Sequence, residues 1–443
     1  MSNPQDPISA PKMSRRRWLA AGGAGLLIAC GALAVYFRPA TPIAALTGAH
    51  APLPAPVVPP TKPEDWRGRI DYRALDQRLA EMTAHHSMEG LAVAVVEDGR
   101  LSFVQGYGLT SAKDGEPVDA NTVFRWASLS KTVAGALTAK LAADGLLSLD
   151  EPLETFHTTL RLPRDAQREL TVEELLSQRT GLPKNAYDDR LEDGQDPAAI
   201  RHALGDVPVA CAPGRCHTYQ NVAYDTITEI LATRTHEAYD QTVQRRLFRP
   251  LGMTSASIGQ AGLVGAARWA RPHREGRVLP MSEAYYRVPG AAGVNSTIVD
   301  LAVWMQAQMG LRPDVLPPAV LDAAQRPRIG TAAPYGRTPF AREIRHAGYG
   351  LGMRSFTYRG HKVIGHSGAV SGYRSTMIFD PATKTGIVML WNSDAGLPFR
   401  FQAEFLDRAY GLPFTDWLDL GEISDQRLAQ ARHLRLRETD EAG

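Results

Sequence analysis

The chain has 443 residues, of which 44% are apolar and 22% are charged, as in an ordinary globular protein with one large or two smaller domains. Its formal net charge is only +2, and residues 1–63 carry +5, so the remainder carries −3. This balance argues against nucleic acid as a partner.

An apolar segment near the N-terminus predicts export or membrane anchoring. It runs without charge over residues 19–37 and follows three arginines at positions 15–17. Its length is at the edge of what spans a bilayer, and the preceding arginines predict that the rest of the chain lies outside the cytoplasm. An uncleaved anchor is preferred to a cleaved signal. A lipoprotein signal ending at Cys30 is the third alternative, because the residues after Cys30 stay apolar.

Composition divides the chain into four regions. These are a basic and apolar N-terminal segment (1–37), a Pro/Ala-rich linker (38–63), a folded domain (64–416) and a charged C-terminal tail (417–443).

Two strand pairs are predicted within residues 64–416, one near each end. The first is joined by Asp98-Gly99, a strong hairpin signal, and the runs of the two pairs are 91–96 with 100–107 and 373–379 with 386–391. Between them the patterns are mostly helical or loop-like, and a helix follows Pro398. We therefore expect one sheet completed by both ends of the domain, with a mainly helical subdomain inserted: an α+β fold.

Ser128 and Lys131 are the most informative residues of the chain. A serine needs a base to become a nucleophile, and this spacing on a helix places both side chains on one face. A helical apolar pattern follows over residues 133–141 and ends at Gly145, which predicts Ser128 in the first helical turn, where free N–H groups favour an oxyanion. The motif alone is weak, because residues 9–12 repeat it.

Cys211 and Cys216 lie just before Tyr219. No second cysteine pair or H-x-x-x-H lies near them, so a metal site is disfavoured, and an oxidising compartment favours a disulfide between the two. Because the loop is short, we expect it to position the approach to Tyr219 more than to add stability.

Two further motifs supply polar groups. Tyr219 and Asn221 form the only Y-x-N among the tyrosines, and His366 with Gly368 forms an H-x-G ahead of a predicted strand, where glycine allows close backbone approach.

In this order and at these separations, the S-x-x-K, Y-x-N and H-x-G motifs resemble the serine β-lactamase and penicillin-binding-protein superfamily. The closer likeness is to its class C, esterase and D-aminopeptidase branch. Four other segments look like family landmarks, although Gln178 and Thr180 depart from the pattern: 171–182, 250–253, 290–297 and 348–352. The resemblance covers residues 68 to 412. It implies a β-lactamase/transpeptidase-like fold, with an antiparallel sheet flanked by helices, and no cofactor or metal.

The resemblance also implies roles for single residues. Ser128 would attack a carbonyl carbon to form an acyl-enzyme that water hydrolyses. Lys131 is the first candidate for the base and Tyr219 the second, and coupled groups of this kind share the work. Asn221 would orient Lys131 and the substrate. The backbone N–H groups of Ser128 and Ala369 would form the oxyanion hole.

Two other motifs compete with His366 and its surroundings. His346 also starts an H-x-G but precedes the segment that resembles the strand ahead of the third motif. Ser367 lies in a sequence like a nucleophile elbow, but a strand pattern follows it where an elbow needs a helix. Because His366 stands where the family also has lysine, we expect weak carboxylate binding at pH 7, a preference for short esters or peptide-like donors over penicillins, and loss of activity on carboxylated substrates as pH rises.

Two functions remain at this point. The first is a serine hydrolase of esters, D-amino-acid peptides or β-lactams, with small-molecule or peptide substrates that include cell-wall fragments, in the periplasm or on the outer face of a bacterial inner membrane. The second is a catalytically silent module that binds peptidoglycan fragments or protein partners. An intact serine and base favour the first, because a binding module needs no base beside a serine.

Overall fold

The computed structural model describes residue 54, residues 57–336 and residues 338–420. The predicted export segment and most of the predicted tail lie outside this range. The chain divides into residues 1–49 and residues 50–443, and the fold below is that of the second unit. Within the described part of the chain, no helix has the length and apolarity needed to span a bilayer.

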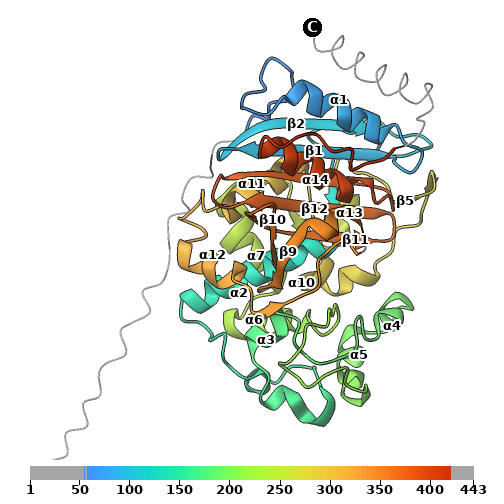
Figure 1. Ribbon diagram of the computed structural model, residues 1–443. Coiled ribbons are helices and arrows are strands. Elements are labelled where there is room, and N and C mark those ends of the chain that lie inside the picture. The colour runs from blue at the N-terminus through green and yellow to red at the C-terminus, as the bar shows by residue number, and fades with distance from the viewer. Residues whose placement is uncertain (1–53, 55–56, 337, 421–443) are drawn as a thin grey trace, which may run out of the picture. The chain divides into compact units, whose positions relative to one another are not determined.

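One antiparallel sheet of eight strands organises the domain (Figure 1). Its strands, in their order across the sheet, are β2 (Arg100–Gly108), β1 (Gly90–Glu97), β13 (Thr385–Trp391), β12 (Tyr373–Asp380), β11 (His361–Val370), β10 (Arg354–Tyr358), β9 (Ile344–Tyr349) and β8 (Ile329–Gly330). Because β1 pairs with β13, both ends of the domain complete one sheet, as the two hairpin patterns predict.

The first predicted hairpin forms at the expected turn. Asp98 and Gly99 both have positive φ, 49° and 82°, which is the backbone twist that suits a two-residue connection between antiparallel strands. Residues 373–380 and 385–391 form the second predicted hairpin. Both predictions are confirmed, because turn chemistry and alternating apolar residues are local signals.

Both faces of the sheet are covered. On one face, alternate residues of β1 pack in a core with α1 (Tyr72–Thr83) and α14 (Leu397–Ala409). Arg78 of α1 makes two hydrogen bonds, of 3.0 and 2.9 Å, to the Glu404 carboxylate of α14. On the other face the intervening β1 residues pack with α2 (Lys131–Ala143) and α11 (Ile298–Gln308). This double burial explains why β1 is apolar at every position from Leu91 to Val96.

The inserted region between β2 and β8 is mainly helical, as predicted. Besides α2 and α11, its helices are α3 (Val172–Leu176), α4 (Asp188–Glu192), α5 (Pro197–Ala203), α6 (Thr226–Thr235), α7 (Tyr239–Val243), α8 (Arg249–Leu251), α9 (Gln260–Val264), α10 (Pro289–Ala292) and α12 (Pro318–Gln325). Its 3-10 and π turns are η1 (Ala127–Ser130), η2 (Leu153–Phe156), η3 (Pro163–Arg168), η4 (Leu204–Asp206), η5 (Gln244–Phe248) and η6 (Ala284–Arg287). A further helix, α13 (Pro339–Glu343), precedes β9.

Two small sheets complete the unit. They are β3 (Phe124–Arg125), β7 (Val294–Ser296) and β4 (Ser257–Ile258), in that order, and the pair β5 (His273–Arg274) with β6 (Arg277–Val278). The three-stranded sheet leads directly into η1 and so positions the segment that carries Ser128.

Three details differ from the sequence predictions. Ser128 lies in the 3-10 turn η1, and α2 begins only at Lys131, so the serine precedes the α-helix instead of occupying its first turn. Strand β11 begins at His361 and includes His366, which the patterns placed ahead of a strand. Trp417 and Leu418 are buried in the core beside α14, past the boundary predicted at residue 416, because the Trp417 indole donates a hydrogen bond to Asp407.

Candidate active site

The candidate nucleophile follows a residue in an unusual backbone conformation. Ala127 has φ 50°, in the left-handed region that residues with a side chain rarely adopt. The Ser130 hydroxyl donates to the Ala127 carbonyl at 2.7 Å and accepts from the Val294 N–H of β7 at 3.0 Å. Ser128 itself is only partly buried and lines a cavity. The turn is thus held firmly from within while its serine side chain stays accessible.

The amine of Lys131 lies next to the Ser128 hydroxyl. The Nζ atom lies 3.4 Å from Ser128 Oγ, 2.7 Å from Asn221 Oδ1 and 3.1 Å from the carbonyl oxygen of Ala291. The side chain is fully buried. Among the described residues its hydrogen-bond partners are neutral oxygens, and no carboxylate forms an ion pair with it. The amine is therefore held where it can exchange a proton with the serine.

Asn221 is oriented by a carboxylate that sequence reasoning missed. Its side-chain N–H donates to Asp188 Oδ2 at 2.6 Å, which turns the amide oxygen toward Lys131. Burial raises the pKa of the Asp188 carboxyl, while the Asn221 hydrogen bond and the charge of Lys131 act against that rise. Asp188 stands in an acidic stretch of α4, and nothing in its local pattern separates it from its neighbours.

Tyr219 lies on a loop that Gln178 holds in place through hydrogen bonds. Gln178 accepts from the Gln220 N–H at 2.7 Å and donates to the Gln220 carbonyl at 3.1 Å, and its own carbonyl accepts from the Thr218 N–H at 2.9 Å. The Tyr219 ring lies 4.7 Å from Lys131 Nζ. The Tyr219 hydroxyl makes no hydrogen bond with another described residue, so it is free to meet a substrate.

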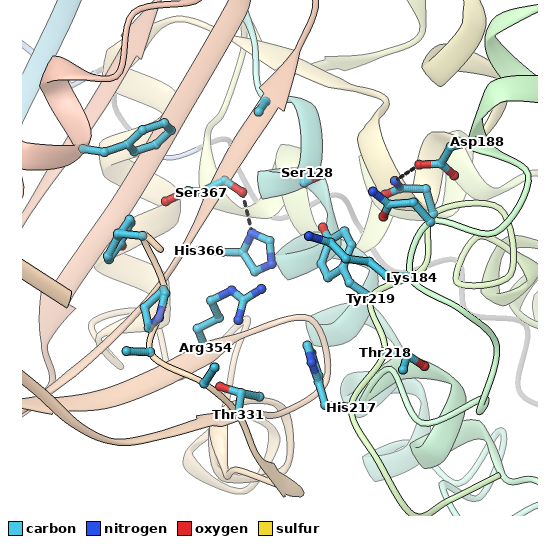
Figure 2. Close-up of a pocket in the computed structure, with 18 of the residues that line it drawn as sticks. Ser128, Lys184, Asp188, His217, Thr218, Tyr219, Thr331, Arg354, His366 and Ser367 are labelled. Carbon is cyan, nitrogen blue, oxygen red and sulfur yellow. Dashed lines mark hydrogen bonds between the residues drawn. The ribbon is translucent and has the colours of Figure 1, made fainter. Parts of the chain in front are cut away.

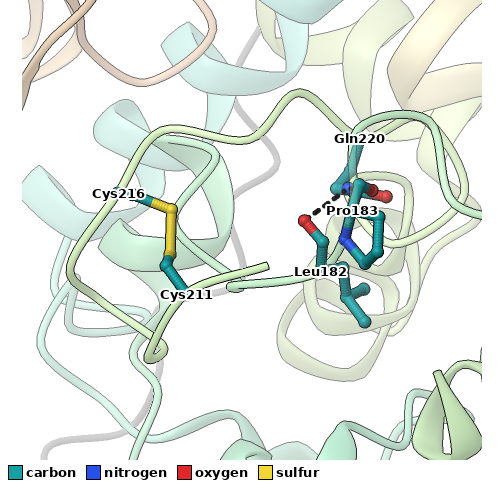
Figure 3. Close-up of a disulfide and its surroundings, with 5 residues drawn as sticks. All are labelled: Leu182, Pro183, Cys211, Cys216 and Gln220. Carbon is teal, nitrogen blue, oxygen red and sulfur yellow. Dashed lines mark hydrogen bonds between the residues drawn. A yellow bond between two sulfur atoms is a disulfide. The ribbon is translucent and has the colours of Figure 1, made fainter. Parts of the chain in front are cut away.

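The Cys211–Cys216 disulfide forms as the sequence predicts and lies on the approach to this loop (Figure 3). Between the two cysteines, the Gly214 N–H donates to the Arg179 carbonyl at 2.7 Å. Arg179 follows Gln178 directly. The disulfide loop is therefore docked on the turn that holds Tyr219, and both cysteines are accounted for without a metal.

Gly368 lets strand β11 approach the serine turn. A Cβ atom at this position would lie 2.0 Å from the Trp126 carbonyl oxygen and 2.3 Å from Ser375 Oγ, distances that no side chain tolerates. The next residue, Ala369, is exposed and lines the cavity with Ser128. The two backbone N–H groups predicted as the oxyanion hole are thus carried by segments in direct contact.

His366 lies at the cavity but is tied up within the protein. Its Nδ1 lies 2.7 Å from the Ser367 carbonyl oxygen and must donate to it, so Nε2, 3.0 Å from the Tyr349 hydroxyl, accepts from that group. Burial, then the charges of Arg354 and Lys131, lower the pKa of His366 well below its usual value. The expectation that this imidazole titrates near neutral pH is wrong, because His366 is buried, with 3% of the residue exposed.

The sequence analysis expected little positive charge at this site, but the cavity carries two cations that it did not consider. Arg354, the first residue of β10, lines the same cavity of 670 Å³ as Ser128, and so does Lys184. Figure 2 shows the Arg354 guanidinium between His366 and His217, pointing into the pocket. The only available sequence signal was a charged residue just after the glycine-rich segment 348–352.

The alternative nucleophile is excluded by its backbone. Ser367 sits in the middle of β11, opposite Thr376 of β12, and not on a sharp turn between a strand and a helix. His346 lies in β9 and is not among the residues that line the cavity.

Comparisons with known proteins show which family the chain belongs to. Residues 75–412 match the β-lactamase family model. The unguisins hydrolase ungD of Aspergillus violaceofuscus is 25% identical over 370 residues, covering 77% of this chain and 65% of the relative. Protein flp of Staphylococcus aureus is 24% identical over 315 residues, covering 68% and 59%. The chain thus spans less than two thirds of the length of each relative.

Solved structures share the fold. The octameric penicillin-binding protein homologue from Pyrococcus abyssi has a TM-score of 0.69 and 23% identity, over 77% of this chain and 78% of that chain. A mutant of a class C β-lactamase has a TM-score of 0.63 and 20% identity, over 78% of this chain and 99% of that chain. At these identities the likeness establishes the β-lactamase/transpeptidase-like fold.

Proposed function

Because the chain belongs to the β-lactamase family, we propose that it is a serine hydrolase that works through an acyl-enzyme on Ser128. The observation that carries the proposal is the pairing of Ser128 Oγ with Lys131 Nζ at 3.4 Å, with the amine held by Asn221 and Ala291. A module that only binds ligands has no use for a buried amine fixed against an accessible serine.

The reaction begins with proton transfer from the Ser128 hydroxyl as its oxygen attacks a carbonyl carbon. Lys131 in its neutral form is the nearest acceptor, and Tyr219, whose ring lies 4.7 Å from the Lys131 amine, is the second. The negative charge on the carbonyl oxygen is met by the N–H groups of Ser128 and Ala369. The bond from the carbonyl carbon to the leaving group then breaks, and the leaving group takes the proton that Lys131 or Tyr219 accepted from Ser128. Water attacks the acyl-enzyme and gives a proton to the same base, the ester bond to Ser128 breaks, and that proton returns to the Ser128 oxygen.

The substrates we propose are esters, D-amino-acid peptides and β-lactams, including fragments of the cell wall. A relative named as an unguisins hydrolase supports hydrolysis as the general activity. A cavity of 670 Å³ has room for a short peptide or a small ester.

The alternative is a catalytically silent module that binds peptidoglycan fragments or protein partners. Reaction with an active-site probe decides between the two. The full chain is treated with a fluorophosphonate and with a fluorescent penicillin, and adducts are located by mass spectrometry of peptides. The serine hydrolase predicts an adduct on Ser128.

Ser128→Ala should lose the adduct and at least about a thousandfold of ester turnover while keeping its melting temperature. Ser367→Ala is the matched control. It removes a second serine that lines the cavity, and this variant should still be labelled on Ser128. Absence of any adduct on the unaltered protein, together with tight binding of peptidoglycan fragments, would establish the silent module instead.

We further propose that the protein is exported and held at the outer face of a membrane by residues 1–37. The Cys211–Cys216 disulfide supports an oxidising compartment. Sequencing the N-terminus of the native protein distinguishes an intact anchor from a cleaved signal, and two free thiols in that preparation would argue against export.

A further inference from the structure

A buried carboxylate that the proposed mechanism does not use lies behind the candidate base. Asp225 is the N-cap residue of α6 and is 1% exposed. Its Oδ1 accepts a hydrogen bond from the Gly290 N–H of α10 at 2.7 Å, and its Oδ2 accepts one from Arg201 Nη1 of α5 at 3.2 Å. Burial, opposed by the charge of Arg201 and the Gly290 N–H, raises the pKa of Asp225 to about 7. Burying a carboxylate costs free energy, so the contacts that it makes there need an explanation.

The contact with Gly290 fixes the segment that holds the Lys131 amine. Helix α10 has only four residues, and the carbonyl oxygen of its third residue, Ala291, accepts from Lys131 Nζ at 3.1 Å. Because Gly290 lies in the first turn, its N–H has no acceptor within the helix, and the Asp225 carboxylate supplies one. A Cβ atom at Gly290 would lie only 3.2 Å from Asp225 Oδ1, so the two segments are closely packed. Asp225 thus docks α10 on the start of α6.

Asp225 also supports the other oxygen that holds the amine. Its backbone N–H donates to the Asn221 carbonyl at 3.0 Å, and Asn221 Oδ1 lies 2.7 Å from Lys131 Nζ. Each of these two acceptors of Lys131 therefore has a buried carboxylate behind it. Asp188 is bonded to the Asn221 amide, and Asp225 to the helix that carries Ala291. The charge of Lys131 acts on both carboxylates, where it opposes the rise in pKa that burial causes.

We propose that Asp225 is a positioning residue, which through Gly290 aims the Ala291 carbonyl at Lys131 and so holds the amine beside the serine hydroxyl. The inference rests on the proposed hydrolase function and deepens it. Without the carboxylate, the Gly290 N–H loses its acceptor and α10 shifts, so the amine spends less time in the geometry that proton transfer needs. Substrate binding is spared, because Asp225 is not among the residues that line the cavity.

Glu229 offers a matched control for a purely structural role. It lies one turn further along α6 and shares Arg201 with Asp225, through an ion pair of 2.8 Å to Arg201 Nη2. It also accepts from the Thr159 N–H at 2.7 Å. Within the described part of the chain, Glu229 makes no hydrogen bond with α10 or Lys131. Its removal therefore disturbs the same buried cluster without releasing Gly290.

The test compares Asp225→Ala, Asp225→Asn and Glu229→Ala with the unaltered protein. The values of kcat and KM are measured for nitrophenyl hexanoate, and the rate of Ser128 labelling is measured with a fluorophosphonate. All measurements are made at a temperature where thermal unfolding shows each variant folded. Because the base serves both formation and hydrolysis of the acyl-enzyme, Asp225→Ala should lower kcat and the labelling rate about 10- to 100-fold and change KM by less than about twofold.

The other two variants should keep most of the activity. Asp225→Asn retains an oxygen that accepts from the Gly290 N–H, so its kcat should stay within about threefold of the unaltered value. Glu229→Ala should lose melting temperature but also keep kcat within about threefold. Unchanged kcat in Asp225→Ala overturns the proposal. So does an equal loss in Glu229→Ala, which would mean that the cluster acts only through stability, or an equal loss in Asp225→Asn, which keeps the acceptor.

A second pair of variants covers the case in which Asp225→Ala does not fold. Asp225→Ala combined with Arg201→Met removes the carboxylate together with the cation that it balances, and it is measured against Arg201→Met alone. The single variant keeps the acceptor for Gly290 and the double variant does not. The proposal requires the lower kcat in the double variant, and equal values overturn it.

Crystal structures separate this inference from the hydrolase activity. In Asp225→Ala, we expect the Ala291 carbonyl to lie beyond hydrogen-bond distance of Lys131 Nζ, with the contact to Asn221 kept. That result supports the positioning role even if the unaltered protein turns over no ester, in which case the hydrolase function fails alone. Ester turnover by the unaltered protein, with an unmoved Ala291 carbonyl in Asp225→Ala, would sustain the hydrolase and refute the role of Asp225.

Discussion

The two sides of the cavity differ in how completely their polar side chains are hydrogen-bonded within the protein. On the catalytic wall, formed by Ser128, Lys131, Asn221 and Ala291, every side-chain amine and amide has a close partner at 2.6 to 3.4 Å. A second part of the lining carries His217 and Arg354, and we call it the cationic wall. There, His217 Nε2 and the Arg354 guanidinium have no hydrogen-bond partner within the described part of the chain. Both walls are polar, but only on the catalytic wall do the side-chain nitrogens all have hydrogen-bond partners within the protein.

The difference separates chemistry from recognition. Groups that move protons must be positioned before substrate arrives, so their hydrogen bonds are complete within the protein. A group that recognises a ligand must leave donors open, because those bonds are completed only by the ligand. The catalytic wall should therefore respond to substitution on all substrates, and the cationic wall only on charged ones.

The largest effect is expected from breaking the catalytic wall at Lys131. Lys131→Met keeps the length of the buried side chain but removes the proton acceptor, and kcat should fall about a thousandfold on every substrate. Stability should also fall by about 1–3 kcal/mol, because Asn221 and Ala291 lose a donor. Ester kinetics and thermal unfolding measure the two effects.

Lys140→Met, near the end of the same helix, is the control. It should leave kcat unchanged. Normal turnover in Lys131→Met would show that another group takes the serine proton and would leave Tyr219 as the base.

A smaller loss is expected when the orientation of Asn221 is weakened. Asp188→Asn removes the charged acceptor that turns the Asn221 amide oxygen toward Lys131, so kcat should fall about tenfold for charged and neutral esters alike, with KM little changed. Asp189→Asn on the same helix turn is the control. If only KM rose, Asp188 would act in substrate binding and not in positioning.

Sequence reasoning succeeded where the signals were local. The Asp98-Gly99 turn needs only two residues with positive φ, and the S-x-x-K spacing brings Ser128 to Lys131 through one turn of backbone. Asn221, ninety residues further along the chain than Lys131, was placed beside it only through the family resemblance. Its position depends on packing between α2 and the inserted region, which no local pattern encodes.

The residues that were missed have roles defined by tertiary contacts. Arg354 and Asp188 carry no motif, and their importance comes from what stands opposite them: an open cavity in one case, an amide in the other. The sequence suggested an ordinary pKa for His366, whereas its burial and the nearby Arg354 keep it neutral. Sequence gives residue type, but the state of a titratable group depends on its surroundings.

An intermediate effect is expected from the disulfide. Replacing Cys211 and Cys216 by serine should lower kcat/KM about three- to tenfold, because the loop docks through Gly214 on the turn that clamps Tyr219. Closing so short a loop contributes at most about 2 kcal/mol by chain entropy, so the melting temperature should change little. A large drop in melting temperature with full activity at low temperature would contradict this view.

The smallest effect is expected from pH, and it distinguishes Arg354 from His366 as the carboxylate-binding group. If His366 supplied the charge with an ordinary pKa near 6.5, the ratio of kcat/KM for a carboxylated ester to that for its neutral partner would fall several-fold between about pH 6 and pH 8.5. Its pKa lies well below that value because the ring is buried beside Arg354 and Lys131, so the charge of His366 does not change over this range. The ratio should therefore vary by less than about twofold. Taking the ratio cancels the titration of the catalytic groups, which both esters share.

The lowered pKa values of His366 and His217 also affect stability. As the pH falls below about 6.5, the unfolded chain takes up protons on these two histidines before the folded protein does. The free energy of unfolding should therefore be at its full value above about pH 6.5 and decrease as the pH falls toward about 4. Kinetics should accordingly be confined to pH values where thermal unfolding shows the protein intact. A ratio that declines steeply through about pH 6.5 in intact protein would return the carboxylate site to His366.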